Sequence, residues 1–253
     1  MSRAVSARTL DRGRGGSGVG YLQQSELPFS SLIFLLPLIV FYEVGTRYFA
    51  AGAIHHYGEQ RIIAFTLMQQ FFMLFGATGK YLPAMAVVGI LLAWHIARRD
   101  PWSVSPATVA GMTIESVLLA IPLIIVGYAA ARYLVLFAAG ASPGNLFVLS
   151  IGAGIYEELV FRLIAFTVLN FLLLDLMKLR RQIGYLLMVL VSAVLFSLYH
   201  YLGEPFSWQT FAFRTAAGAY FGVVFICRGF GITAGAHAAY DVQIVLLRLL
   251  ASR

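Results

Sequence analysis

Long apolar segments separated by short polar ones run through the whole chain. Most approach or exceed the ~20 residues that an α-helix needs to cross the hydrocarbon core of a bilayer. The alternation of apolar and polar residues that outer-membrane strands require is absent from the sequence. The pattern therefore predicts an all-α, polytopic transmembrane helical bundle with seven or eight spans. The candidate spans are about 30–50, 61–77, 82–97, 109–138, 146–175, 183–202, 207–227 and 230–250.

The number of spans depends on the second segment, 61–77. It contains Gln69 and Gln70 and ends in the polar sequence GATGK, so it crosses the membrane, re-enters it or lies along the interface. Basic residues orient the later spans by the positive-inside rule, which places them on the cytoplasmic side. These residues, at alternate span ends, are Arg98, Arg99, Lys178, Arg180, Arg181 and Arg228.

Composition supports a membrane protein. The chain is 60% hydrophobic and 11% charged, whereas soluble domains carry roughly 25% charged residues. The net charge of +7 comes from clustered basic residues of the kind that set membrane topology, so we expect no nucleic-acid partner. Cys227 is the only cysteine, which excludes an intramolecular disulfide and argues against a thiolate metal cluster. We expect an integral, multi-pass protein of the cell (inner) membrane.

The N-terminal part is predicted to differ from the rest. Residues 1–24 contain four arginines and the run GRGGSGVG, a composition typical of a flexible basic tail. The first apolar run starts only at Phe29 and no small-residue cleavage pattern follows it, so we expect no removed signal peptide. Residues 25–253 are predicted to form one transmembrane domain.

Candidate chemistry starts with Glu157, Glu158 and Arg162 in the apolar segment 146–175. An ionisable group at membrane depth costs at least ~2.5–3.5 kcal/mol, so three of them together indicate a function. Glu158 and Arg162 are four residues apart and can pair on one helix face. Glu157 is rotated ~100° from Glu158. One glutamate is therefore expected to face a reaction cavity and the other to hold the scaffold or the substrate backbone. A purely structural ion pair would not require the second glutamate.

Two further polar sites follow on the next helices. Phe196 and His200 are four residues apart, as are His237 and Asp241, so each pair lies on one helix face. A carboxylate at that spacing can fix the tautomer of an imidazole. Alone, His200 could be an interfacial residue and the second pair a packed polar contact. Together with the glutamates they predict a site in which a carboxylate activates water and imidazoles assist it or stabilise an oxyanion.

Three motifs give the chain a resemblance to a known family. GIYEELVFR resembles the EExxxR motif of the CAAX-protease and bacteriocin-processing (CPBP/Abi) family of intramembrane endopeptidases, which includes prenyl-protein proteases. LFSLYH resembles the FxxxH motif of that family, and HAAYD resembles its third motif, a His followed four residues later by Asn or Asp. The resemblance covers roughly 145–245, the motif core of the predicted protease domain. EExxxR alone is a weak pattern, but all three motifs in order are specific.

The resemblance implies a glutamate-type protease without a required metal or cofactor. Glu157 would be the general base that activates water, assisted by His200. Glu158 and Arg162 would support the site or hold the substrate backbone, and Phe196 belongs to the second motif.

The resemblance also implies that His237 and the residue at 241 stabilise the oxyanion. Position 241 is Asp here, where prenyl-protein proteases usually carry Asn, and an ionised Asp cannot donate a hydrogen bond. Asp241 is then protonated, orients His237 or helps to bind a metal. In the metal alternative, Glu157, His200 and His237 would be three zinc ligands that leave an open position for water.

The implied reaction is cleavage of a membrane-anchored protein or peptide near its C-terminus. The substrate would be a prenylated CAAX protein, a bacteriocin or peptide precursor, or a C-terminal sorting signal. The partners are this substrate and the lipid bilayer, and the sequence predicts no oligomeric state. A transporter or proton relay would also use buried Glu, Arg and His, but we find no inverted repeat. An inactive membrane scaffold is the other alternative.

The positions of the two histidines impose a geometric condition. At ~1.5 Å per residue, His200 lies far from the cytoplasmic end of its span, whereas His237 lies only a few residues past Arg228. The imidazoles can meet only if the helices tilt or if the segment 229–235 is unwound. Non-helical backbone at that depth is tolerated where it lines a wet cavity.

Overall fold

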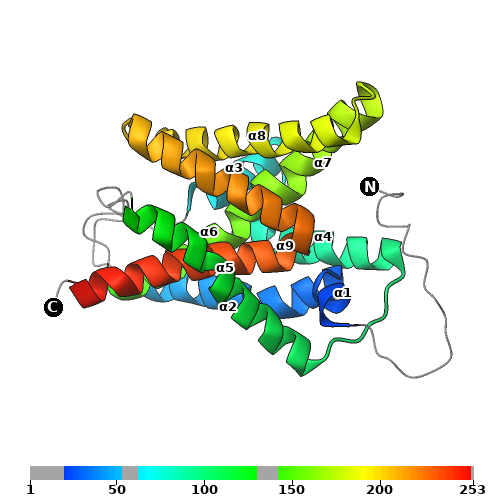
Figure 1. The fold of residues 1–253 in the computed structure, drawn as a ribbon. Helices are drawn as coiled ribbons and strands as arrows, with labels where there is room; N and C mark the ends of the chain where they lie inside the picture. Colours follow the sequence, from blue (N-terminus) through cyan, green and yellow to red (C-terminus); the bar gives the residue numbers. More distant parts are fainter. Residues whose placement is uncertain (1–19, 53–61, 130–141, 252–253) are drawn as a thin grey trace.

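The computed structural model describes residues 20–52, 62–129 and 142–251, and every regular element within these ranges is helical (Figure 1). Within the described ranges, twelve helical elements follow one another. They are α1 (Tyr21–Ser25), α2 (Pro28–Gly52), α3 (Ile63–Leu74), α4 (Leu82–Arg98), α5 (Pro106–Ala129), α6 (Pro143–Glu158), the π-helix η1 (Leu159–Ile164), α7 (Ala165–Asn170), the π-helix η2 (Phe171–Leu176), α8 (Arg181–Tyr199), the 3₁₀-helix η3 (His200–Leu202) and α9 (Trp208–Ala251).

The helices confirm the predicted polytopic bundle. Among the described residues, five helical stretches are long and apolar enough to cross a membrane, and α3 and α4 are shorter apolar helices. The crossing stretches are Pro28–Phe49, Pro106–Gly127, Pro143–Leu176, Arg181–Leu202 and Trp208–Ala251. Each of the eight predicted apolar segments is mainly helical within its described residues, although the second is helical only over Ile63–Leu74. Residue 61 of the second segment and 130–138 of the fourth lie outside the described residues.

The last two predicted spans are the two limbs of α9, which turns sharply at Gly229. Gly229 has φ 74° and ψ −175°, the only non-helical conformation within α9. Residues with a side chain rarely adopt this backbone conformation. Figure 1 shows the limbs 208–228 (orange) and 230–251 (red) running in different directions. The turn at Gly229 therefore allows His200 and His237 to meet. The expectation that 229–235 is unwound is correct only for Gly229, because the rest of this segment is helical.

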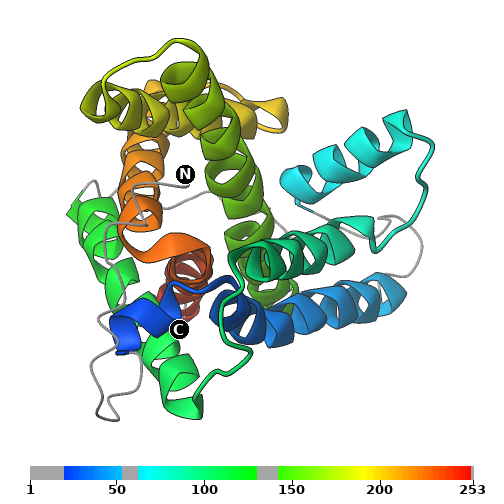
Figure 2. The ribbon, with the colours of Figure 1, turned by 90° about the vertical axis from the view of Figure 1, so that its right-hand side faces the viewer.

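The second limb of α9 lies in the centre of the bundle. Figure 2 shows it nearly end-on, surrounded by other helices. α6 packs against it without room for side chains between them, because a Cβ added to Gly154 would lie 2.5 Å from the backbone nitrogen of Ala238. Small residues allow such close approach between membrane helices. This packing brings the end of α6 next to the polar residues of α9.

The segment predicted as one helix over 146–175 contains two π-helical stretches. The first, η1, follows Glu158 directly and carries Arg162. Ser192 on α8 donates a hydrogen bond to the carbonyl of Phe161, at 2.6 Å. A π-helical turn widens the helix and often marks a functional site. Here it lies at the junction between α6, α8 and α9.

α1 includes the last residues of the segment predicted as a flexible tail. Residues 21–24 were expected within the flexible segment 1–24 but belong to α1. Arg228, which precedes the turn in α9, donates to the carbonyl of Leu22 and to the Ser25 hydroxyl. A contact with a residue about 200 positions away thus fixes this helix. The remainder of the predicted tail, 1–19, lies outside the described residues.

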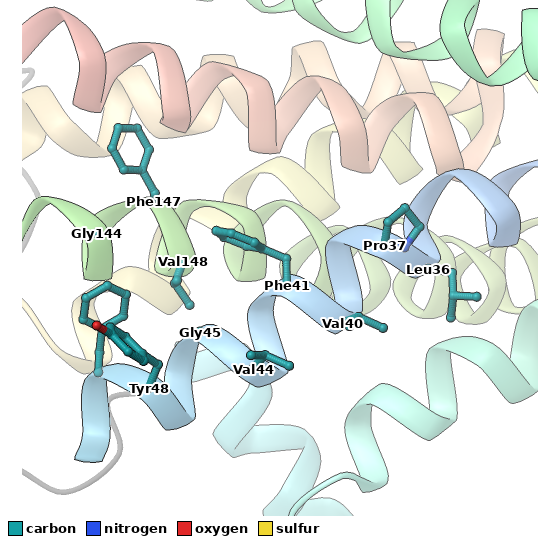
Figure 3. Close-up of a pocket in the computed structure, with 11 residues that line it drawn as sticks. Leu36, Pro37, Val40, Phe41, Val44, Gly45, Tyr48, Gly144, Phe147 and Val148 are labelled. Carbon is teal, nitrogen blue, oxygen red and sulfur yellow. The ribbon is translucent and has the colours of Figure 1, made fainter. Parts of the chain in front are cut away.

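An apolar groove of about 870 Å³ runs between α2 and the start of α6 (Figure 3). Its lining is almost entirely hydrocarbon and includes Val40, Phe41 and Val44 of α2 and Phe147 of α6. None of the residues predicted to carry chemistry lines it. The polar site described next therefore lies elsewhere in the bundle.

Candidate active site

The structure brings all the sequence-predicted site residues together. Glu157 and Glu158 end α6, and Arg162 lies one turn later in η1. Phe196 is on α8 and His200 begins η3 directly after it. The second limb of α9 supplies His237 and Asp241. All except His200 are buried, and His200 is half-buried.

Glu158 lies at the centre of the buried charge network. Its Oε2 is 3.1 Å from Nε of Arg162, the predicted pair one helical turn apart, and both residues are 0% exposed. Its Oε1 is 2.7 Å from Nδ1 of His237. An ionised carboxylate only accepts hydrogen bonds, so Nδ1 of His237 carries the proton. Glu158 therefore links α6 to the second limb of α9.

Arg162 is held on several sides. Its Nη2 donates to the carbonyl of Gly218 in the first limb of α9, at 2.9 Å. Its guanidinium lies over the ring of Phe196, 4.6 Å from the centroid, a cation–π contact. Phe221 lies at 5.8 Å from the same guanidinium and stacks on the His237 ring with centroids 4.7 Å apart. The predicted motif residue Phe196 thus helps to enclose a buried cation.

Glu157 points to a different set of partners, as its rotation from Glu158 predicts. Its Oε1 accepts a hydrogen bond of 3.0 Å from the Tyr199 hydroxyl. Its Oε2 lies 3.9 Å from Nε2 of His200 and 3.9 Å from Nε2 of His237. These distances are too long for direct hydrogen bonds, and polar atoms so separated are commonly bridged by water. Glu157 is thus the carboxylate that faces both imidazoles.

The tautomer of His200 follows from its backbone contact. Nδ1 of His200 lies 2.8 Å from the carbonyl oxygen of Phe196. A carbonyl only accepts, so Nδ1 carries the hydrogen. In neutral His200, Nε2 is then an unprotonated acceptor directed towards Glu157.

Asp241 lies on the other side of His237 from Glu158. Its Oδ2 is 3.7 Å from Nε2 of His237, beyond hydrogen-bonding distance. The sequence left open whether Asp241 fixes the tautomer of His237, and in the structure Glu158 occupies Nδ1. Asp241 therefore interacts with His237 electrostatically, without a hydrogen bond, at Nε2, the nitrogen that also faces Glu157.

Tyr199 is a site residue that the sequence analysis missed. Its hydroxyl donates to Glu157 and also accepts a hydrogen bond of 3.0 Å from the backbone nitrogen of Ala64 in α3. Its ring contacts that of Phe161 edge-on, with centroids 5.1 Å apart. The only sequence signal was its place next to His200 in LFSLYH, where an aromatic residue suggests ordinary packing.

The geometry fits the metal alternative poorly. Two ligands of one tetrahedral zinc ion, each about 2.0–2.2 Å from the metal, lie roughly 3.4 Å apart. Both Nε2 atoms are 3.9 Å from Oε2 of Glu157. In the part of the chain that the structure describes, no group of three or more His, Cys, Asp or Glu side chains is arranged to hold a metal ion.

Comparison with known proteins agrees with the motifs. Residues 139–243 match the family model described as type II CAAX prenyl endopeptidase Rce1-like. The matched region contains every sequence-predicted site residue. No curated protein and no solved structure matches the chain.

Proposed function

We propose that this chain, whose residues 139–243 match the Rce1-like model of type II CAAX prenyl endopeptidases, is an intramembrane endopeptidase of that family whose general base is Glu157. The observation that carries this assignment is the position of the Glu157 carboxylate. Its Oε2 faces Nε2 of both His200 and His237 at 3.9 Å. A water bound between these atoms would lie next to one base and two imidazoles.

His200 is proposed to orient the attacking water. Its Nδ1 hydrogen is taken by the carbonyl of Phe196, so neutral His200 accepts at Nε2. Water donates one hydrogen to Nε2 of His200 and the other to Oε2 of Glu157. As Glu157 takes its proton, the oxygen attacks the carbonyl carbon of the scissile peptide bond. The protonated Glu157 then delivers the proton to the leaving amine, which balances the reaction.

His237 is proposed to stabilise the oxyanion. Its Nδ1 hydrogen faces Glu158, so Nε2 can donate only when His237 is an imidazolium. We assign that charged form, because three carboxylates surround the ring: Glu158 at 2.7 Å, Asp241 at 3.7 Å and Glu157 at 3.9 Å. A fixed cationic donor in a water-poor site stabilises the charge that develops on the substrate oxygen. Asp241 then supports the charge of His237 and does not contact the oxyanion.

The proposed substrate is a membrane-anchored protein cut near its C-terminus. CAAX sequences occupy the C-terminal end of proteins and carry the prenyl group on their cysteine. Such a lipid anchor would hold the scissile bond close to the bilayer, where the helices of this bundle lie. Peptide precursors and hydrophobic sorting signals share the same requirement for membrane attachment.

The direct test is a cleavage assay with purified protein in liposomes. The panel contains a prenylated CAAX peptide, a bacteriocin-type precursor and a C-terminal sorting peptide, and mass spectrometry locates the cut. Wild type is compared with Glu157→Ala and Glu157→Gln, with and without a chelator. Cleavage that both variants lose and that survives the chelator supports the proposal. Loss of cleavage with the chelator and recovery with zinc would replace it by the metal mechanism. A substrate that Glu157→Ala still cleaves at the wild-type rate would overturn it.

A further inference from the structure

The hydroxyl of Tyr199 connects the proposed base to a helix outside the family-matched region. It donates to Oε1 of Glu157 and accepts from the backbone nitrogen of Ala64, each at 3.0 Å. A backbone N–H can only donate, so the tyrosine oxygen is the acceptor in the contact with Ala64. Its single hydrogen is therefore directed to Glu157. The two contacts together fix the direction of both hydrogen bonds.

This contact determines which oxygen of Glu157 is available for chemistry. Oε1 is engaged by Tyr199, which leaves Oε2 to face His200 and His237. The tyrosine ring cannot turn away easily, because it contacts the rings of Phe161 and His200 at centroid distances of 5.1 Å and 4.8 Å. Tyr199 thus holds the carboxylate in the orientation that the proposed mechanism requires.

The contact with Ala64 also gives a hydrogen-bond acceptor to a backbone N–H in the first turn of α3. The first N–H groups of a helix have no partner within the helix, and Ile62 at the N-cap position has an apolar side chain that cannot accept a hydrogen bond. Ala64 is fully buried, so water does not reach its N–H. Tyr199 of α8 supplies the missing acceptor. The first turn of α3 and the carboxylate of Glu157 therefore share one hydroxyl group.

Aromatic packing holds the same turn of α3 from a second side. Phe65 is fully buried and contacts Tyr156 edge-on at 4.9 Å and Tyr42 at 5.8 Å between centroids. Tyr156 directly precedes Glu157 in α6. α3 is thus anchored to the side chain of Glu157 through Tyr199 and to the adjacent backbone through Tyr156.

We propose that Tyr199 is a positioning residue for Glu157 and that the first turn of α3 is part of the catalytic scaffold. This inference rests on the proposed function, because it assigns Glu157 as the base. It extends the active site beyond 139–243, to a helix that carries none of the three motifs. Loss of the hydroxyl would release Oε1 of Glu157 and leave the N–H of Ala64 buried without an acceptor.

The test compares Tyr199→Phe with a matched control in liposomes. Misplacement of a catalytic group by about 1 Å can cost 10²-fold in rate, so we expect kcat to fall about 10- to 100-fold in Tyr199→Phe. KM should change less than about 3-fold, because an interaction that only positions the base does not bind substrate. Tyr201→Phe is the control, since the Tyr201 hydroxyl contacts Ser207 and Thr210 and not Glu157. It should keep the wild-type kcat.

A second variant tests the contribution of α3 and leaves Tyr199 intact. Phe65→Ala removes the aromatic anchor of α3 and should lower kcat about 10-fold, with KM nearly unchanged. Phe71→Ala is its control, because Phe71 lies on the same helix and is exposed. If both variants act through Ala64, Tyr199 and Glu157, the double variant will be no slower than Tyr199→Phe alone, since coupled residues are not additive.

The inference is overturned if folded Tyr199→Phe keeps the wild-type kcat. It is also overturned if the effects of Phe65→Ala and Tyr199→Phe multiply, because α3 would then act independently of the tyrosine. If Tyr199→Phe does not fold, Phe65→Ala decides, and an unchanged kcat in that variant rejects the role of α3. The parallel Glu157→Gln assay separates the two proposals. An active Glu157→Gln variant rejects the proposed function and, with it, the role of Tyr199, whereas an inactive Glu157→Gln beside a fully active Tyr199→Phe rejects this inference alone.

Discussion

Nδ1 of His237 lies 2.7 Å from Oε1 of Glu158, whereas its Nε2 lies 3.7 Å from Oδ2 of Asp241. The residue that orients the imidazole is therefore the second glutamate of the first motif. Glu158 makes this contact with one oxygen while its other oxygen pairs with Arg162. The two adjacent glutamates thus have separate tasks, with Glu158 holding the scaffold and Glu157 facing the histidines.

Glu158→Gln is expected to destabilise the protein strongly. Arg162 is completely buried and would lose its carboxylate partner, and breaking a buried ion pair costs about 3–5 kcal/mol. The free energy of unfolding should fall by this amount in chemical denaturation of the protein in detergent. An unchanged value would show that Arg162 does not depend on Glu158.

The double variant Glu158→Gln with Arg162→Met should separate stability from activity. Removing both charges of the pair leaves no unpaired buried charge, so the double variant should be more stable than Glu158→Gln alone. It should still cleave about 100-fold more slowly than wild type, because Nδ1 of His237 no longer has a carboxylate partner. A double variant less stable than the single one would contradict this account.

Gly229→Ala is expected to lower both stability and activity through the backbone. A Cβ at Gly229 would meet only atoms of Glu26, at 3.8 Å or more, so crowding is not the cause. The conformation with φ 74° and ψ −175° costs a residue with a side chain about 1–3 kcal/mol. A change at this turn displaces His237 and should reduce kcat.

The matched control for this turn is Gly89→Ala. A Cβ there meets nothing within 4 Å, and Gly89 lies inside α4, so this variant should be as stable as wild type or up to about 1 kcal/mol more stable. The account fails here if thermal unfolding and kcat of Gly229→Ala equal those of Gly89→Ala.

Arg228→Lys is expected to loosen α1 although the charge is kept. Arg228 donates from Nη1 to Glu26 and from Nη2 to both Ser25 and Glu115, each at 2.8–2.9 Å. A lysine cannot reproduce this planar fork, and each hydrogen bond lost to a charged group is worth about 1.5–3 kcal/mol. Limited proteolysis should cut near α1 faster than in wild type. Arg180→Lys, at an exposed position, is the control and should be cut at the wild-type rate.

Stability should decline at alkaline pH through Tyr21. Burial, and then the hydrogen bond to Glu115, raise the pKa of Tyr21 from 10.0 to about 12. Because the folded state keeps its proton to higher pH than the unfolded state does, this contribution is complete below pH 10 and is lost as pH rises to about 12. Unfolding measured between pH 10 and 12 should be less pH-dependent in Tyr21→Phe. Equal slopes would contradict the assignment.

The helices could be predicted from the sequence because hydropathy reports burial in lipid directly. The turn within α9 depends on one residue, Gly229, and the sequence marked only a broader glycine-containing segment around it. α1 follows a Gly-rich run, so its order could not be predicted, because it depends on Arg228 about 200 residues away. The π-helical turn at Arg162 has no local sequence signal.

The sequence could predict those contacts of the candidate site that join two residues of the same helix. Glu158 and Arg162 form the pair that their spacing indicates. The same spacing allowed Asp241 to orient His237, but Glu158, 79 residues away, occupies Nδ1 of the imidazole. Tyr199 was missed for a related reason, because one of its partners is the backbone of Ala64, whose hydrogen bonding leaves no mark in the residue type.

The most direct test of the central claim is the single-turnover rate of Glu157→Gln on a substrate that the wild type cleaves in liposomes. The amide keeps the shape of the side chain and can still accept from Tyr199, but it cannot take a proton from water. We predict a rate about 10³-fold below wild type, with unchanged thermal unfolding and unchanged substrate binding. A folded Glu157→Gln protein that cleaves within about 10-fold of the wild-type rate would show that Glu157 is not the base.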